Sequence, residues 1–123
     1  MIGYVTFGTN DLAKAVTFYD GLFSVIGAKR YMELDRGVAW SMGLGTPGFA
    51  IMKPYDGQPA SVGNGNMLAI IVDNRAKVDA LYNKALEMGG TDDGPPGQRF
   101  EMVYAAYFRD LDGNKLNAYY MGP

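Results

Sequence analysis

The chain contains an internal repeat, and this repeat limits the folds that the sequence can adopt. Residues 3–28 align with residues 66–91 at a constant offset of 63, and the alignment needs no gap. Matched positions include Asn10-Asp11 with Asp73-Asn74, Tyr19 with Tyr82, and Gly27 with Gly90. Because turn residues, helical residues and closing glycines share one register, the sequence predicts two copies of one supersecondary unit.

Each copy begins with a predicted strand and continues into a predicted helix. Residues 2–8 and 66–72 are apolar and rich in β-formers, as a half-buried strand requires. Polar residues that can cap a helix follow, and glycines end each helix because glycine adopts the left-handed conformation at little cost. The caps are Thr9-Asn10-Asp11 and Asp73-Asn74, and the closing glycines are Gly27 and Gly89-Gly90. Apolar residues recur at three- and four-residue steps in both helices, which predicts one buried face on each.

Three short strands are expected after each helix. The candidates are residues 29–34, 37–43 and 48–54 in the first copy, and 91–93 (weak), 99–109 and 114–121 in the second. The intervening segment 53–65 is rich in Pro, Gly, Ser and Asn, which is typical of a linker. The sequence therefore predicts an α+β fold, in which two βαβββ modules form a curled mixed sheet, a cup, with the helices outside. We expect a single domain over residues 1–123, with module one at about 1–56, a linker at about 57–65 and module two at about 66–123.

Composition excludes several classes of function. The chain has no histidine and no cysteine, which excludes Ser-His-Asp triads, paired-histidine metal sites and thiol nucleophiles. Its net charge is −2 with no basic cluster, so we expect no nucleic-acid partner. No apolar run is long enough to cross a membrane, and residues 1–11 lack the features of a signal peptide. We therefore expect no membrane partner and a cytoplasmic location.

The ordered motifs resemble the vicinal oxygen chelate superfamily of glyoxalase, bleomycin-resistance and dioxygenase-like proteins. The motifs are Thr9-Asn10-Asp11-Leu12, Phe18-Tyr19, the helix ending Ala85-Leu86-Glu87-Met88-Gly89-Gly90, and the closing Asp110-Leu111-Asp112-Gly113-Asn114-Lys115-Leu116-Asn117. The resemblance covers essentially the whole chain and implies the two-module fold. It does not specify a member, since the superfamily includes glyoxalase I, extradiol dioxygenases, methylmalonyl-CoA epimerase and antibiotic-resistance proteins.

The resemblance also implies where a divalent metal would bind in the cup. The superfamily's enzymes place metal ligands on the first and last strands of each module, and these positions carry Tyr4, Met67, Asn117 and a residue near Met52 here. A protonated phenol, two thioethers and a neutral amide are poor ligands for zinc, nickel or magnesium. We therefore expect no metal, no other cofactor and no catalytic residue.

Strand alternation and the resemblance together suggest a ligand site inside the cup. Tyr4, Thr6, Met67, Asn117 and Tyr119 are expected to face inward, with Tyr104 at the mouth. The complete candidate set is Tyr4, Thr6, Trp40, Met52, Met67, Tyr104, Asn117 and Tyr119. An aromatic and apolar wall with few polar groups is typical of small-molecule sites, and the superfamily's bleomycin-resistance proteins sequester a drug without a metal. The favoured function is metal-independent binding of an apolar or aromatic ligand.

Two alternatives to this binding function stay open. In the first, the inward aromatic and methionine side chains form the core of a dimeric module with no active cup. In the second, the protein is a glyoxalase- or lyase-type enzyme with a divergent site. The resemblance implies a homodimer, either side by side or with exchanged modules. Lys53-Pro54-Tyr55-Asp56-Gly57 forms either a lid over the cup or a plain linker, and Arg36 belongs to a solvated turn.

Overall fold

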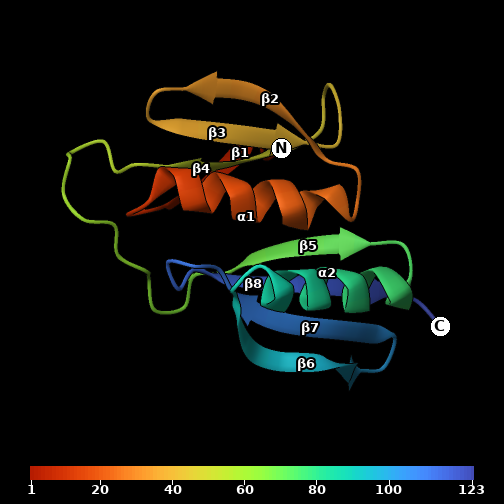
Figure 1. Ribbon diagram of the computed structural model, residues 1–123. Coiled ribbons are helices and arrows are strands. Elements are labelled where there is room, and N and C mark those ends of the chain that lie inside the picture. The colour runs from red at the N-terminus through yellow and green to blue at the C-terminus, as the bar shows by residue number, and fades with distance from the viewer.

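The computed structural model describes residues 1–123 and contains two four-stranded sheets with one helix each (Figure 1). The first module comprises β1 (Tyr4–Gly8), α1 (Leu12–Ser24), β2 (Lys29–Leu34), β3 (Gly37–Ser41) and β4 (Gly48–Met52). The second comprises β5 (Leu68–Val72), α2 (Arg75–Glu87), β6 (Thr91–Phe100), β7 (Val103–Arg109) and β8 (Lys115–Met121). The predicted α+β fold of two βαβββ modules is confirmed.

The two sheets have the same topology. Their strand orders are β1-β4-β3-β2 and β5-β8-β7-β6, and in each sheet the first strand runs parallel to the last while the other pairs are antiparallel. Hereafter they are sheet A (β1–β4) and sheet B (β5–β8). The sheets remain separate, because no Cα of β1 lies within 8 Å of a Cα of β5. Consequently β1 and β5 each keep one unpaired edge.

Side-chain caps explain where the two helices begin. The Asp11 carboxylate accepts a hydrogen bond from the backbone N–H of Lys14, and the Asn74 side chain accepts one from Lys77. These two caps occupy matched positions of the repeat, and each satisfies an amide that the helix leaves free. Asn10 has a different role, since its side chain binds the backbone of Ala60 in the linker.

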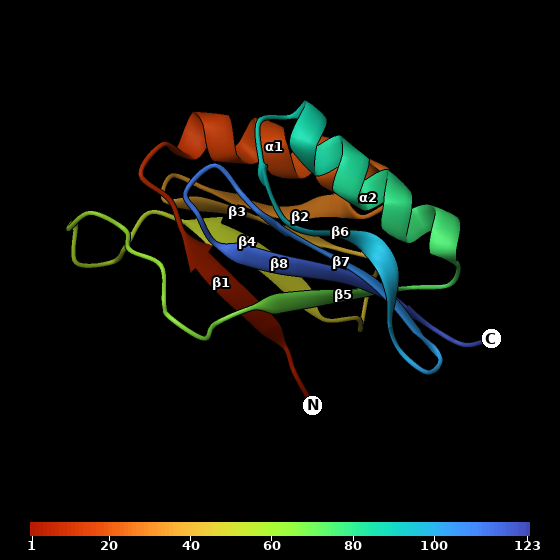
Figure 2. The same ribbon diagram turned by 90° about the horizontal axis from the view of Figure 1, so that it is seen from below.

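One hydrophobic core runs through both modules. The two helices lie side by side on one side of the molecule, with the strands on the other (Figure 2). Polar contacts also join the modules: the Tyr19 hydroxyl donates to Asp110 Oδ2 at 2.6 Å, and Asn114 Nδ2 donates to Gly8 O at 3.1 Å. The helix-facing sides of both sheets are therefore buried, whereas much of the opposite faces is exposed.

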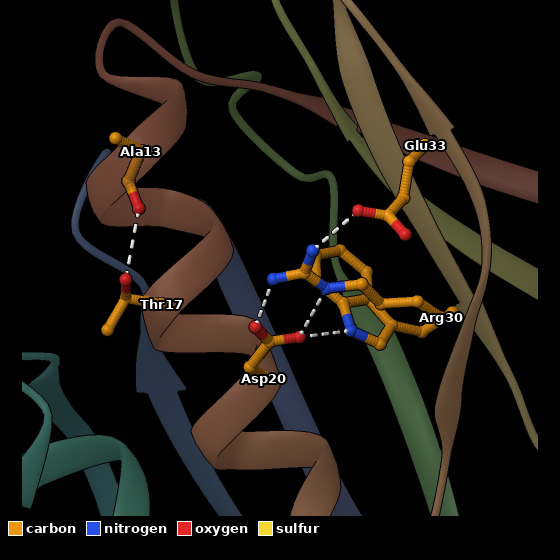
Figure 3. A network of polar contacts seen from close by, with 6 residues as sticks. Ala13, Thr17, Asp20, Arg30 and Glu33 are labelled. Atoms are coloured by element: carbon orange, nitrogen blue, oxygen red, sulfur yellow. Dashed lines mark hydrogen bonds and ion pairs between the residues drawn. The ribbon is translucent and has the colours of Figure 1, made fainter.

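Within module one, a polar network fixes α1 against sheet A. Asp20 on α1 accepts hydrogen bonds from Arg30 on β2 and from the Trp40 indole Nε1 on β3, the latter at 2.9 Å (Figure 3). Arg30 also forms an ion pair with Glu33 at 2.8 Å (Figure 3). The Trp40 N–H is thus satisfied although its side chain is buried.

Strand β6 differs most from the sequence prediction. The weak strand expected at 91–93 extends to Phe100, and the strand expected from residue 99 begins only at Val103. β6 contains Pro95 and Pro96, and its pairing with β7 shifts register three times. Proline is tolerated because β6 is the edge strand of sheet B, where one side of the backbone needs no partner.

None of the helices is long and apolar enough to span a lipid bilayer.

Candidate functional site

The face of sheet A that turns away from α1 forms the candidate site. Strand pairing places alternate residues of all four strands on this face. They are Tyr4, Thr6 and Gly8 on β1, Ala50 and Met52 on β4, Gly37 and Ala39 on β3, and Met32 and Leu34 on β2. The opposite face carries the large residues Phe49, Ile51 and Trp40, which pack into the core.

A pocket of about 700 Å³ lies on this face of sheet A. Its floor is made of small residues, chiefly Gly37, Ala39 and Ala50, and the Met52 side chain lies over Gly37. Its walls are larger and mostly apolar or aromatic: Tyr4, Tyr31, Met32, Leu34 and Met52. Such a volume and lining are typical of sites that bind a drug-sized molecule.

The segment after β4 closes one side of the pocket. Pro54, Tyr55, Pro59 and Ala60 line it together with the strands. Asn10 holds this segment in place, because its Oδ1 accepts from Ala60 N at 2.7 Å and its Nδ2 donates to Ala60 O at 3.1 Å. Residues 53–56 of the segment expected to be a lid or a plain linker thus border the pocket.

Three of the predicted site residues come together in this pocket. Tyr4, Thr6 and Met52 all line it, from the first and last strands of module one. The Tyr4 side chain is 67% exposed, so its ring is open to a ligand or a partner. The alternation expected for β1 also holds, because Phe7 packs on Phe49 with ring centroids 5.5 Å apart, on the helix side of the sheet.

Trp40 and Tyr104 do not line the cup, and these two predictions are wrong. Trp40 is paired with Phe49 across β3 and β4 and shares its face, so its ring lies in the core, 2% exposed. The Tyr104 side chain faces α2, where its hydroxyl donates to Asp79 Oδ1 at 2.7 Å. This hydrogen bond, followed by burial, raises the pKa of Tyr104, which holds its proton and acts as a donor.

Met67, Asn117 and Tyr119 belong to module two and do not reach the pocket of module one within one chain. Asn117 and Tyr119 lie on the face of sheet B opposite α2, as expected. Asn117 is buried, and its Nδ2 donates to Ala106 O at 3.0 Å. Met67 lies just before β5 and is 44% exposed.

Side chains of module two occupy part of the corresponding face of sheet B. Tyr107 pairs with Asn117 and lies between two cations, with Arg99 Cζ 5.6 Å and Lys115 Nζ 5.3 Å from its ring centroid. Favourable cation–π contacts hold these groups over the sheet. The two modules therefore differ: sheet A has an apolar pocket on this face, whereas on sheet B Tyr107 and two cations lie over the part of the face next to Asn117.

The four positions that correspond to the superfamily's metal ligands do not fit a divalent ion. Asn117 offers only a neutral amide oxygen, since its Nδ2 donates within sheet B, and Tyr4 and Met52 supply a phenol and a thioether. The structure has no group of three or more His, Cys, Asp or Glu side chains that could hold a metal. Zinc, nickel and manganese prefer imidazole and carboxylate ligands, so we derive no metal-assisted step.

Several residues of the pocket were not among the predicted site residues. Tyr31, Met32 and Leu34 come from β2, and Arg36 and Lys53 lie at the end of the pocket near the β2–β3 turn. The backbone N–H of Lys53 donates to Arg36 O at 2.7 Å, which holds the main chains of the two residues next to each other. Alternation in β2 could have indicated Met32 and Leu34, since both lie two residues apart and pair with the small residues Ala39 and Gly37.

Fold and site together define a two-module α+β protein with a concave, mostly apolar pocket. The sequence model of the Glyoxalase/Bleomycin resistance protein/Dioxygenase superfamily matches residues 1–118. The chain therefore belongs to this superfamily. No functionally curated protein matches the chain.

Solved structures agree with this assignment. A glyoxalase/bleomycin resistance protein from Albidiferax ferrireducens T118 is 34% identical, with 98% of each chain covered and a TM-score of 0.90. A hypothetical protein from S. aureus is 25% identical, with 98% of this chain and 92% of that chain covered and a TM-score of 0.76. A lactoylglutathione lyase from Agrobacterium tumefaciens shares the fold at 20% identity and a TM-score of 0.70, covering 98% and 92%.

Proposed function

We propose that this protein binds an apolar or aromatic small molecule without a metal, on the open face of sheet A. The observation that carries the proposal is the pocket itself: about 700 Å³ above a floor of small residues, walled by Tyr4, Tyr31 and Met52. Apolar area removed from water supplies the affinity, at about 25 cal/mol per Å² before the costs of binding. No catalytic group is required for this function.

We further propose that a second copy of the chain completes the cup. β1 and β5 each have an unpaired edge, and exposed edges pair readily with another strand. If β1 of one chain pairs with β5 of its partner, a two-fold axis makes the reciprocal pair at the same time and leaves neither edge free. The apolar side chains of Tyr4 and Ile71, which are 67% and 65% exposed, would then be covered.

This arrangement would bring the two halves of the predicted site together. Tyr4, Thr6 and Met52 of one chain would face Met67, Asn117 and Tyr119 of the partner across one cup. Sheet A would supply the open wall and sheet B the wall that carries Tyr107. The cytoplasmic location expected from the sequence stays a prediction.

Thermal unfolding tests this function. The protein is heated with nickel, zinc, manganese or EDTA, and separately with bleomycin and a panel of aromatic antibiotics. A ligand at about 100 times its Kd adds about 2.7 kcal/mol to the free energy of unfolding and raises Tm by several degrees. We expect at least one organic compound to raise Tm and the metals and EDTA to leave it unchanged.

Two other outcomes support the competing functions. A rise in Tm with one metal that EDTA reverses would contradict the proposal and favour a glyoxalase- or lyase-type enzyme with a divergent site. A dimer that neither metals nor organic compounds stabilise would favour a module without an active cup.

A further inference from the structure

The pocket on sheet A contains two cations without a carboxylate partner. Arg36 and Lys53 both line it, and neither takes part in an ion pair. By contrast, five of the other cationic side chains do: Arg30, Lys77, Lys84, Arg109 and Lys115. The chain as a whole carries a net charge of −2, so this pair is a local excess of positive charge.

The surroundings neutralise the pair only in part. Asp56 is the only acidic residue that lines the pocket, it forms no ion pair with Arg36 or Lys53, and its Oδ1 accepts the backbone N–H of Gln58 at 2.9 Å, so the lining keeps one net positive charge. The Arg36 guanidinium lies over the Tyr55 ring, 5.0 Å from its centroid. Stacking on a ring uses the face of the guanidinium and leaves the N–H groups at its edge available to an anion.

Backbone geometry brings the main chains of Arg36 and Lys53 together where β4 ends and β3 begins. The hydrogen bond from Lys53 N to Arg36 O, 2.7 Å long, holds the end of β4 against the turn between β2 and β3. The apolar floor and walls begin directly beside them, at Gly37 and Met52. The pocket therefore has a charged end and an apolar body.

We infer that the ligand is an organic anion, with a carboxylate or sulfonate at Arg36 and Lys53 and an aromatic or aliphatic body along the floor of sheet A. This inference rests on the proposed function and specifies the ligand class for the same pocket. Charge-assisted hydrogen bonds to the anion fix the orientation of the ligand, and the apolar body contributes most of the affinity.

The test compares two fluorescent probes that share an aromatic frame and differ in charge. 8-Anilinonaphthalene-1-sulfonate is an anion, and N-phenyl-1-naphthylamine is neutral. Both are titrated into wild-type protein and into the double variant Arg36→Gln/Lys53→Gln. We expect the anion to bind more tightly to the wild type, and the double variant to lose about tenfold in affinity for it while its affinity for the neutral probe stays the same.

A matched control removes the same charge elsewhere. Lys14 and Lys29 also lack ion-pair partners and do not line this pocket, so Lys14→Gln/Lys29→Gln should bind both probes like the wild type. Raising the salt concentration should weaken binding of the anion only, because salt screens exposed charges.

The outcomes separate the two proposals. If neither probe binds to the wild type, the proposed function itself is contradicted. If both probes bind and the Arg36/Lys53 variant has wild-type affinity for each, the proposed function is supported and the anion inference is overturned. It is also overturned if this variant keeps its affinity for the anion but dissociates a dimer in sedimentation, since the two cations would then meet carboxylates of the second copy.

Discussion

Asp110 is a buried carboxylate that its neighbours satisfy entirely with neutral donors. It accepts hydrogen bonds from the Tyr19 hydroxyl, from the backbone N–H groups of Asp112 and Asn114, and from Asn114 Nδ2. Burial, followed by the charge of Asp110, raises the pKa of Tyr19 well above its ordinary value, so the phenol stays protonated. Tyr19 and Asp110 belong to different modules, so the hydrogen bond between their side chains joins the two modules.

Replacing Tyr19 by phenylalanine should destabilise the protein. A buried carboxylate would lose one charge-assisted hydrogen bond, which costs about 1.5–3 kcal/mol of unfolding free energy. Tyr82 occupies the matched position of the repeat, but its hydroxyl donates to Asp92, which is exposed and can bind water instead. Urea unfolding should therefore show a smaller loss for Tyr82→Phe, below about 1 kcal/mol. Equal losses in the two variants would contradict a special role for the buried pair.

At the residue scale, the sequence alone predicts the buried face more reliably for an outer strand such as β1 than for an inner strand such as β3. Tyr4 and Thr6 were placed correctly by alternation, because the flanking Val5 and Phe7 are apolar and indicate the helix side. In β3 every residue from Val38 to Trp40 is apolar, so the pattern gives no direction. Only the pairing of Trp40 with Phe49 shows that the indole faces the core. Polar partners of tyrosine, such as Asp79 for Tyr104, are equally invisible without the fold.

At the scale of secondary-structure elements, Asp20 joins α1 to β2 and β3. Its carboxylate accepts from Arg30 and from the buried Trp40 Nε1, and these hydrogen bonds, led by that of Arg30, lower the pKa of Asp20 (Figure 3). Asp20 and Arg30 are partly exposed, with side-chain exposures of 40% and 36%, so solvent screens the ion pair. The ion pair therefore contributes much less to the free energy of unfolding than the same pair would in a dry interior.

The variant Asp20→Asn should lower stability by about 0.5–1 kcal/mol at pH 7, since the amide still accepts from Trp40 but no longer pairs with Arg30. A depressed pKa in the folded state contributes stability above the unfolded-state value, near 3.9, and this stability is lost as pH falls through the folded-state value. The difference between the wild type and the variant should hence be full at pH 7, begin to shrink near pH 3.9, and disappear only once the pH is below the lowered folded-state pKa of Asp20. Urea unfolding at several pH values measures it; a difference that is independent of pH would contradict the account.

The sequence predicts secondary-structure elements correctly where interactions between residues close in the chain determine them. The caps Asp11 and Asn74 and the periodic apolar faces locate both helices from the sequence. Strand β6 was missed over most of its length because Pro95 and Pro96 normally argue against a strand. Their tolerance depends on β6 being an edge strand, which is a property of the sheet order rather than of the segment.

At the scale of the whole molecule, the repeat predicts two modules but not their mutual arrangement. The helices pack against each other, the sheets stay apart, and β1 and β5 remain unpaired. Whether one chain or two chains complete a cup depends on which surfaces are buried together, and periodicity carries no such information. The open pocket of sheet A likewise results from small residues on three strands that come together only in the fold.

A charge on the exposed face of β5 should dissociate the proposed dimer. Ile71 is 65% exposed in one chain, so Ile71→Glu removes little from the core of the module, but it would bury a carboxylate at the interface. Sedimentation velocity should show a dimer for the wild type and a monomer for Ile71→Glu at the same concentration. Leu44→Glu, at a fully exposed position outside the strands, is the control and should remain dimeric. A monomeric wild type would contradict the two-chain cup.

The central claim is that the face of sheet A binds a small apolar molecule without a metal. The most direct measurement is a titration of N-phenyl-1-naphthylamine into EDTA-treated wild type, into Thr6→Phe, which fills the pocket from the β1 side, and into Thr17→Phe, which places the same ring on exposed α1. The account predicts saturable binding to the wild type and to Thr17→Phe, unchanged by added nickel, zinc or manganese, and at least tenfold weaker binding to Thr6→Phe. Binding that requires an added metal, or that Thr6→Phe leaves intact, would contradict it.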